Sequence, residues 1–121
     1  MGDLESIARA EVGAVLRELP PEVRREAVGI PVTCESWPSK GLEQDGVAPD
    51  TLGLLVGGNR NEEAAGLLAV PVQIFLFLEN LWAEADGRVR AYREEVRITY
   101  LHELGHYLGL EEEDMEPRGL A

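Results

Sequence analysis

The sequence has little cysteine and little positive charge. A single cysteine, Cys34, in 121 residues cannot form an internal disulfide, so the protein does not require an oxidising compartment. This cysteine is expected to be buried in a strand. The chain has 11 lysines and arginines and 23 aspartates and glutamates, which gives a formal net charge of −12. Such an excess of negative charge disfavours binding to nucleic acid or to an anionic membrane.

Long hydrophobic runs and a basic leader are also missing. No apolar run approaches the roughly 20 residues that span a bilayer. The first residues, 1–5, are acidic, whereas a secretory signal begins with basic residues. We therefore expect a cytoplasmic protein without a membrane partner. Its 121 residues, 45% of them hydrophobic, predict one domain, residues 1–121, with a core of its own.

Hydrophobic spacing and chain breakers predict four helices and three strands. The helices are expected at residues 4–19, 22–27, 79–85 and 88–108, and the strands at 29–35, 51–56 and 70–78. Asp3 is expected to cap the first helix. Residues 36–50 and 59–66 are expected to be loops. The third strand is apolar on both faces, which favours a central place in its sheet.

The last predicted helix combines a core stripe with a polar margin. An apolar stripe is expected to pack on the sheet, with residues that recur every three to four positions: Val89, Tyr92, Val96, Tyr100, Leu104 and Tyr107 or Leu108. The margin beside the stripe is expected to face a cleft.

That margin holds the pattern H-E-x-x-H, which contains both histidines of the chain, His102 and His106. Residues four apart lie on the same face of a helix, so the two imidazoles can point at one metal ion. Glu103 places a carboxylate beside that ion, where a base can take a proton from a metal-bound water. The pattern is the signature of zinc metalloproteases. The alternative interpretation is an amphipathic helix end whose histidines cap carbonyl groups or pack in the core.

The reaction predicted by this pattern is the hydrolysis of a peptide bond by a zinc-bound water. His102 and His106 are expected to bind zinc together with an acid from the C-terminal tail. Glu103 is expected to act as general base and then to donate the proton to the leaving amine. Tyr100 and Tyr107 are candidates for stabilising the oxyanion, although core positions are expected for both.

The order of the elements, the turn at residues 19–22 and the segment 101–114 resemble a small bacterial family of zincin-like metallopeptidases. The resemblance covers nearly the whole chain, and residues 102–114 are its most specific part. It implies an α+β fold in which a small mixed β-sheet is backed by helices, with zinc held by an active-site helix near the C-terminus. It also implies a metzincin-like turn, because Gly109 follows the second histidine by three residues.

Two positions depart from a full metzincin motif, and they bear on the third zinc ligand. Glu112 stands where that motif has a third histidine, and Met115 follows too closely to form the usual methionine-bearing turn. Glu112 is the first choice for the third ligand and Asp114 is the alternative. Donors from upstream, Glu79 or Glu84, are also possible. The remaining possibility is that the acids of the tail are solvated and that water completes the zinc shell.

Two further functions compete with the peptidase. One is a non-catalytic zinc-binding or acidic protein-interaction module, which the small size favours. The other is a regulatory, antitoxin-like partner whose acidic surface binds a basic protein. Glu103 favours the enzyme, because a structural zinc site does not need a base at that place. The expected partner is therefore a peptide or protein substrate.

Overall fold

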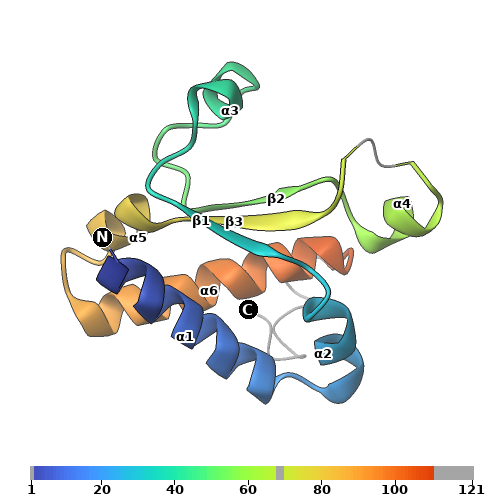
Figure 1. Cartoon of the computed structure of the whole chain (residues 1–121), viewed down its shortest axis with the longest axis horizontal. Coiled ribbons are helices and arrows are strands. Elements are labelled where there is room, and N and C mark those ends of the chain that lie inside the picture. Colours follow the sequence, from blue (N-terminus) through green and yellow to red (C-terminus); the bar gives the residue numbers. More distant parts are fainter. Residues whose placement is uncertain (1, 68–69, 111–121) are drawn as a thin grey trace.

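The fold is α+β, with a three-stranded sheet lying over a layer of helices (Figure 1). The computed structural model describes residues 2–67 and 70–110. The elements are α1 (Gly2–Glu18), α2 (Pro21–Ala27), β1 (Val32–Glu35), α3 (Lys40–Gln44), β2 (Gly53–Val56), α4 (Arg60–Ala64), β3 (Gln73–Phe77), α5 (Leu78–Glu84) and α6 (Val89–Tyr107). This arrangement confirms the predicted α+β class with a small mixed sheet.

The sheet has the order β1-β3-β2, so the apolar strand β3 is central, as predicted. β1 runs parallel to β3 and β2 runs antiparallel to it. The central strand alternates its side chains between two faces, and Ile74, Leu76 and Phe77 are fully buried. Cys34 lies in β1 as predicted, but it is only partly buried because β1 is at an edge of the sheet.

The long helix α6 lies beneath the sheet and supplies the largest share of the core (Figure 1). Almost all of the predicted stripe is buried: Tyr92, Val96, Tyr100, Leu104, Tyr107 and Leu108. The prediction was wrong for Val89, which is 45% exposed. Val89 is the first residue of α6 and lines a surface cavity together with Trp82 of α5, so it lies outside the region that the sheet covers.

The first helix, α1, packs alongside α6 through Ala8, Val12 and Val15. Helix α1 begins at Gly2, so Asp3 lies in its first turn and is not the predicted cap. A carboxylate in the first turn still interacts favourably with the helix dipole.

Polar contacts also join these two helices. Arg97 of α6 forms ion pairs of 2.9 Å with Glu11 and 2.8 Å with Glu18, both on α1. The Tyr92 hydroxyl donates a 2.8 Å hydrogen bond to the Leu4 carbonyl. The helix that carries the histidines is therefore fixed along its N-terminal half by both apolar and polar contacts.

Both segments predicted as loops contain short helices, which corrects the prediction. Helix α3 begins where the Ser39 hydroxyl accepts a hydrogen bond from the Leu42 amide. Helix α4 begins with a capping box, in which Asn59 and Glu62 each accept a hydrogen bond from the other's amide. The side-chain caps satisfy amides that a short helix would otherwise leave unpaired. These helices lie at opposite ends of the sheet (Figure 1).

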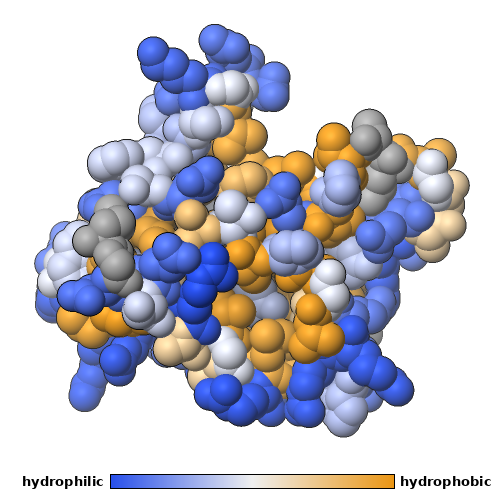
Figure 2. Space-filling model, in the orientation of Figure 1, coloured by the Kyte–Doolittle hydropathy of each residue, from blue (hydrophilic) through white to orange (hydrophobic). Residues whose placement is uncertain are grey.

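The surface carries both hydrophobic and hydrophilic residues. On the face shown in Figure 2, hydrophobic residues gather between the sheet and the helices and are surrounded by hydrophilic ones. Within residues 2–67 and 70–110, no helix is both long enough and apolar enough to cross a membrane.

Candidate active site

The candidate site is built on the C-terminal half of α6. This helix ends in a Schellman motif, in which the Leu110 amide bonds to the Gly105 carbonyl and the Gly109 amide to the His106 carbonyl, both at 3.0 Å. Gly109 has a φ of 76°, which confirms it as the predicted left-handed terminator. The second histidine of the motif thus lies in the last turn of a well-defined helix.

The two histidines lie next to each other on the helix surface. Their ring centroids are 4.6 Å apart and the rings meet at 80°. His102 is half-buried and His106 is exposed. Two adjacent imidazoles reachable from solvent are donors that suit zinc. Within the part of the chain that the structure describes, no group of three or more metal-binding side chains comes together.

Glu103 lies on the side of α6 that faces β2, and it is half-buried. Burial raises the pKa of the Glu103 carboxyl above its usual value. His106, His102 and a hydrogen bond from the Leu55 amide act in the opposite direction and favour the ionised carboxylate. A carboxylate with a raised pKa, held between two imidazoles and a strand, is suited to accept and return a proton.

The edge strand β2 approaches α6 closely at Gly53. A Cβ atom added to Gly53 would lie 2.5 Å from Cγ2 of Thr99 and 3.5 Å from Cγ of Glu103. Thr99 is 7% exposed, so its methyl group fills the space that a side chain at Gly53 would need. The absence of a side chain at Gly53 is therefore what allows the strand to lie beside Glu103.

The outer edge of β2 presents backbone groups on the side away from β3. Leu54 pairs with Phe75, and the Phe77 amide bonds to the Leu52 carbonyl. Along an antiparallel strand, the backbone groups of successive residues point alternately toward one neighbour and the other. Leu52 and Leu54 face β3, so the amides and carbonyls of Gly53 and Leu55 point away from the sheet. The Leu55 amide lies close enough to Glu103 to lower the pKa of its carboxyl, which agrees with this alternation.

A cavity of about 290 Å³ opens between this edge and α6. His102 and Glu103 belong to its lining. Leu52, Ile98 and Thr99 make the remainder largely apolar. His102 and Glu103 thus face a cleft, as the sequence predicts, whereas His106 does not belong to its lining.

The candidate third zinc ligands either lie outside the described residues or are distant from the histidines. Glu112 and Asp114, the candidate third ligands, lie outside the described residues. Glu79 and Glu84 belong to α5, next to the start of α6 (Figure 1), and His102 is 13 residues beyond Val89, about 20 Å along the helix. Neither glutamate is therefore placed to share a metal ion with the histidines.

The two candidate tyrosines are core residues. Tyr100 is 1% exposed and Tyr107 is 7% exposed. The Tyr107 hydroxyl donates a 2.6 Å hydrogen bond to Glu63 of α4, and burial raises the pKa of Tyr107 to about 12. This bond ties α4 to the end of α6, so Tyr107 is engaged in holding the structure together.

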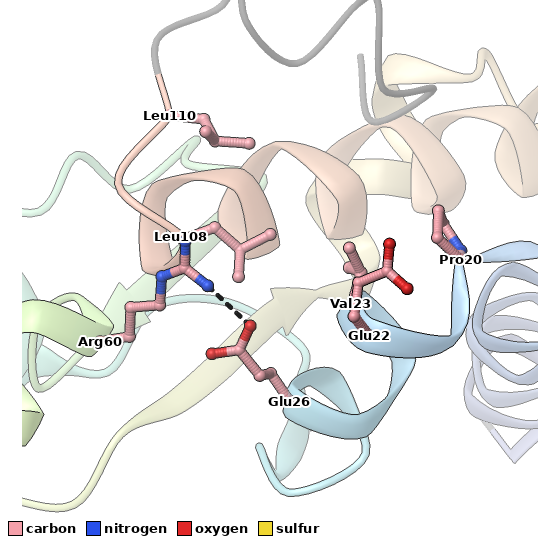
Figure 3. A pocket seen from close by; sticks show the side chains of 7 residues that line it. All are labelled: Pro20, Glu22, Val23, Glu26, Arg60, Leu108 and Leu110. Carbon is pink, nitrogen blue, oxygen red and sulfur yellow. Dashed lines mark hydrogen bonds and ion pairs between the residues drawn. The ribbon is translucent and has the colours of Figure 1, made fainter.

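A second cavity, of about 510 Å³, lies elsewhere and has a different character. Figure 3 shows Leu108 pointing toward α2 and the Arg60–Glu26 ion pair at the edge, with a distance of 2.7 Å between the charged groups. Leu108 is two residues after His106, about 200° around the helix. The cavity is therefore on another side of α6 from the histidines and contains neither of them.

Sequence reasoning missed the contribution of β2. Gly53, Leu55 and Ile98 were assigned only to a strand or a helix. Gly53 carried one signal, since a glycine inside a predicted strand indicates a close approach of another group. The exposed position of Ile98, which is 45% accessible, follows from its place outside the core stripe.

Comparison with known proteins agrees with this geometry. Residues 27–120 match the family model described as zincin-like metallopeptidase. The match includes the sheet, the motif and most of the tail, which is more than half of the chain. Comparison with curated proteins found no match.

Proposed function

The chain belongs to the zincin-like metallopeptidase family, and we propose that it hydrolyses peptide bonds with Glu103 as general base and a zinc ion held by His102 and His106. The family supports a zinc-dependent peptidase acting on peptide or protein substrates. The observation that carries the finer assignment is the position of Glu103, between two adjacent imidazoles and the edge of a sheet.

The residues of the site fit zinc by the chemistry of their donors. Two imidazole nitrogens suit this ion, and catalytic sites add one further protein donor. We propose Glu112 for that donor, with Asp114 as the alternative. When bound, zinc lowers the pKa of a water molecule to about 7 and polarises a carbonyl group.

Glu103 acts as the general base and then as the general acid in this proposal. Its carboxylate takes a proton from the attacking water and then delivers that proton to the leaving amine. Partial burial raises the pKa of Glu103, which makes the carboxylate a stronger base than one in free solution. A non-catalytic zinc module does not need a carboxylate at this place, and therefore the position of Glu103 favours the enzyme.

The edge of β2 offers a binding track for the substrate. An extended peptide can add to an open sheet edge as a further strand, and its main chain then supplies the hydrogen bonds. The outward backbone groups of Gly53 and Leu55 lie beside Glu103, so a peptide on this edge would pass the proposed base. We propose that this edge, and not that of β1, receives the substrate.

The test compares wild-type protein, purified without chelator, with the Glu103→Gln variant. We expect about one zinc per chain in both, because Glu103 is not a ligand. Cleavage of a peptide library should fall roughly 10²–10⁴-fold in the variant and should stop when a chelator is added to wild type.

Glu94→Gln is the matched control, since Glu94 is an exposed carboxylate on the same helix. It should leave cleavage unchanged. Equal turnover by Glu103→Gln and wild type would refute the role of Glu103. His102→Ala with full zinc content would refute the metal site.

A further inference from the structure

A cavity of about 380 Å³ opens where the first turns of α1 lie against α5 and the start of α6 (Figure 1). Its lining consists of Asp3, Leu4, Ile7, Glu79, Trp82 and Val89. Val89 precedes His102 by 13 residues, about 20 Å along α6. The cavity therefore shares no side chain with the proposed active site, and peptide hydrolysis does not use it.

Each of the two helices at this cavity contributes a carboxylate beside an apolar side chain. Asp3 and Ile7 are four residues apart on α1, so they lie on one face of that helix. Glu79 and Trp82 are three residues apart on α5 and share a face in the same way. Val89 of α6 adds an apolar side chain that is 45% exposed. The cavity thus combines two negative charges with apolar surface.

The two carboxylates have no cation beside them in the part of the chain that the structure describes. Among residues 2–67 and 70–110, neither Asp3 nor Glu79 forms an ion pair or a side-chain hydrogen bond. None of the described residues that line the cavity is basic. Glu79 is also half-buried, and a carboxylate with reduced hydration gains more from a nearby cation than an exposed one does. The charges in this cavity therefore suit a cationic ligand.

The ring of Trp82 is held in place before any ligand binds. It meets the ring of Tyr92 edge-on, with centroids 5.6 Å apart and an interplanar angle of 78°. The chain turns next to the ring at Gly87, whose φ is 69° and where a Cβ atom would lie 3.7 Å from Cζ2 of Trp82. The indole face attracts cations more strongly than other aromatic side chains do. A ring that is already fixed loses little freedom when a ligand contacts it.

We propose that this cavity binds a primary ammonium group carried on an apolar chain. The ammonium group pairs with Glu79 and Asp3 and contacts the ring of Trp82, while the chain covers the aliphatic side chains of the lining. The net charge of −12 favours the approach of a cation. Free alkylamines and the lysine side chains of a partner protein share this chemistry. The proposal does not depend on the peptidase function.

The experiment titrates the full chain with hexylammonium chloride and follows the two indole signals in a proton–nitrogen NMR spectrum. The Trp82 signal should move with a Kd of roughly 1 mM or below, within reach of a ligand of this size. The signal of Trp37, which does not belong to the lining, should stay in place. 1-Hexanol has the same chain without the charge and should bind at least about 10-fold more weakly. Equal affinity for both compounds, or a Trp82 signal that does not move, would overturn the proposal.

Three carboxylate variants test the charges of the cavity. Glu79→Gln keeps the shape of the side chain and should weaken hexylammonium binding about 10-fold. Asp3→Asn should weaken it less, because Asp3 is exposed. Glu84→Gln is the matched control, since Glu84 is an exposed carboxylate on the same helix outside the lining, and it should bind as wild type does. Full affinity in Glu79→Gln, or an equal loss in Glu84→Gln, would refute a specific ion pair.

Two changes at Val89 locate the ligand in the cavity. Val89→Lys places an ammonium group of the protein itself there and should abolish hexylammonium binding, whereas Val89→Leu should retain it. Wild-type affinity in Val89→Lys would contradict the proposal. Glu103→Gln should bind hexylammonium as wild type does, so a failure of the peptidase proposal leaves this site measurable.

A second ligand distinguishes the two sources of the ammonium group. Nα-acetyl-lysine N-methylamide presents a lysine side chain with its backbone capped on both sides. Tighter binding of hexylammonium would assign the cavity to a free alkylamine. Binding of the capped lysine at least as tight as that of hexylammonium would assign it to a lysine of a partner protein. If neither compound moves the Trp82 signal, the cavity is not an ammonium site.

Discussion

Replacing Gly53 with alanine tests the close approach between β2 and the motif helix. The added Cβ would lie 2.5 Å from Cγ2 of Thr99 and 3.2 Å from the carbonyl oxygen of Phe75. Carbon atoms in contact normally stand about 3.5–4.0 Å apart, so Thr99 and the strand must separate by roughly 1 Å. The Thr99 side chain is buried and the second neighbour is backbone, so neither can move aside cheaply.

The cost follows from two opposing effects. Overpacking of this kind costs about 1–3 kcal/mol. Replacing glycine also lowers the conformational entropy of the unfolded chain, which stabilises the folded state by up to about 1 kcal/mol. This gain applies here because Gly53 does not have a left-handed φ, which would strain an alanine. We expect a net destabilisation of about 1–2 kcal/mol, which lowers Tm by about 4–8 °C. Cleavage should fall as well, because the edge of β2 would move away from Glu103.

Urea denaturation of a double-mutant cycle checks the cause. Thr99→Ser removes the Cγ2 methyl group, so Gly53→Ala should cost at least about 1 kcal/mol less in that background. Gly13→Ala is the control, because its Cβ would meet only the tip of Arg17, at 3.5 Å, and it should stabilise α1 by about 0.5–1 kcal/mol. A Gly53→Ala variant as stable as wild type, or one with the same cost in both backgrounds, would refute the reasoning.

Three further predictions concern the tail, the acidic surface and α4. Glu112→Ala should weaken zinc affinity, measured by competition with a chelator, clearly more than Asp114→Ala; the reverse order would assign the ligand to Asp114. The hydrogen bond from Arg97 lowers the pKa of Glu18 below its ordinary value, so the stabilising effect of this bond is fully present above the ordinary pKa and is lost as the pH falls through the lowered one. The stability difference between wild type and Arg97→Ala should therefore narrow on acidification, and a constant difference would contradict this. Tyr107→Phe removes the 2.6 Å bond to Glu63 and should cost about 0.5–1.5 kcal/mol in urea denaturation, whereas an unchanged midpoint would show that water replaces it fully.

The motif helix was predictable because its signals are local. A core stripe every three to four residues and a terminating glycine place residues 88–108 in a helix, and the structure has it at 89–107. The spacing of His102, Glu103 and His106 then follows from the helical period alone. The three strands were also predicted, because chain breakers mark their ends. Each is two to four residues longer in the prediction than in the structure, because the residues next to the breakers do not join the hydrogen-bonded sheet.

The short helices were missed because five residues are too few for a hydrophobic period. A local signal was nevertheless present for α4, since Asn59 followed three residues later by Glu62 is the pattern of a capping box. For α3 the corresponding signal was weaker, because Ser39 alone marks its start.

The partnership between β2 and the motif could not be predicted from the sequence. The alternation of apolar and polar residues indicates which face of a strand is buried. It does not indicate which helix packs against that face or which strand is at the edge of the sheet. The contacts of Gly53 with Thr99 and of Leu55 with Glu103 span more than 45 residues of chain. They exist only once the order β1-β3-β2 has formed.

The outward amide of Leu55 lies near the Glu103 carboxyl and gives the site a spectroscopic probe. A backbone amide resonance responds to the charge of a group close to it, so the Leu55 signal in a proton–nitrogen NMR spectrum should move as Glu103 is titrated. A peptide added to β2 would bond to the same outward amide. One backbone resonance would thus report both the ionisation of the carboxylate and the arrival of an extended ligand.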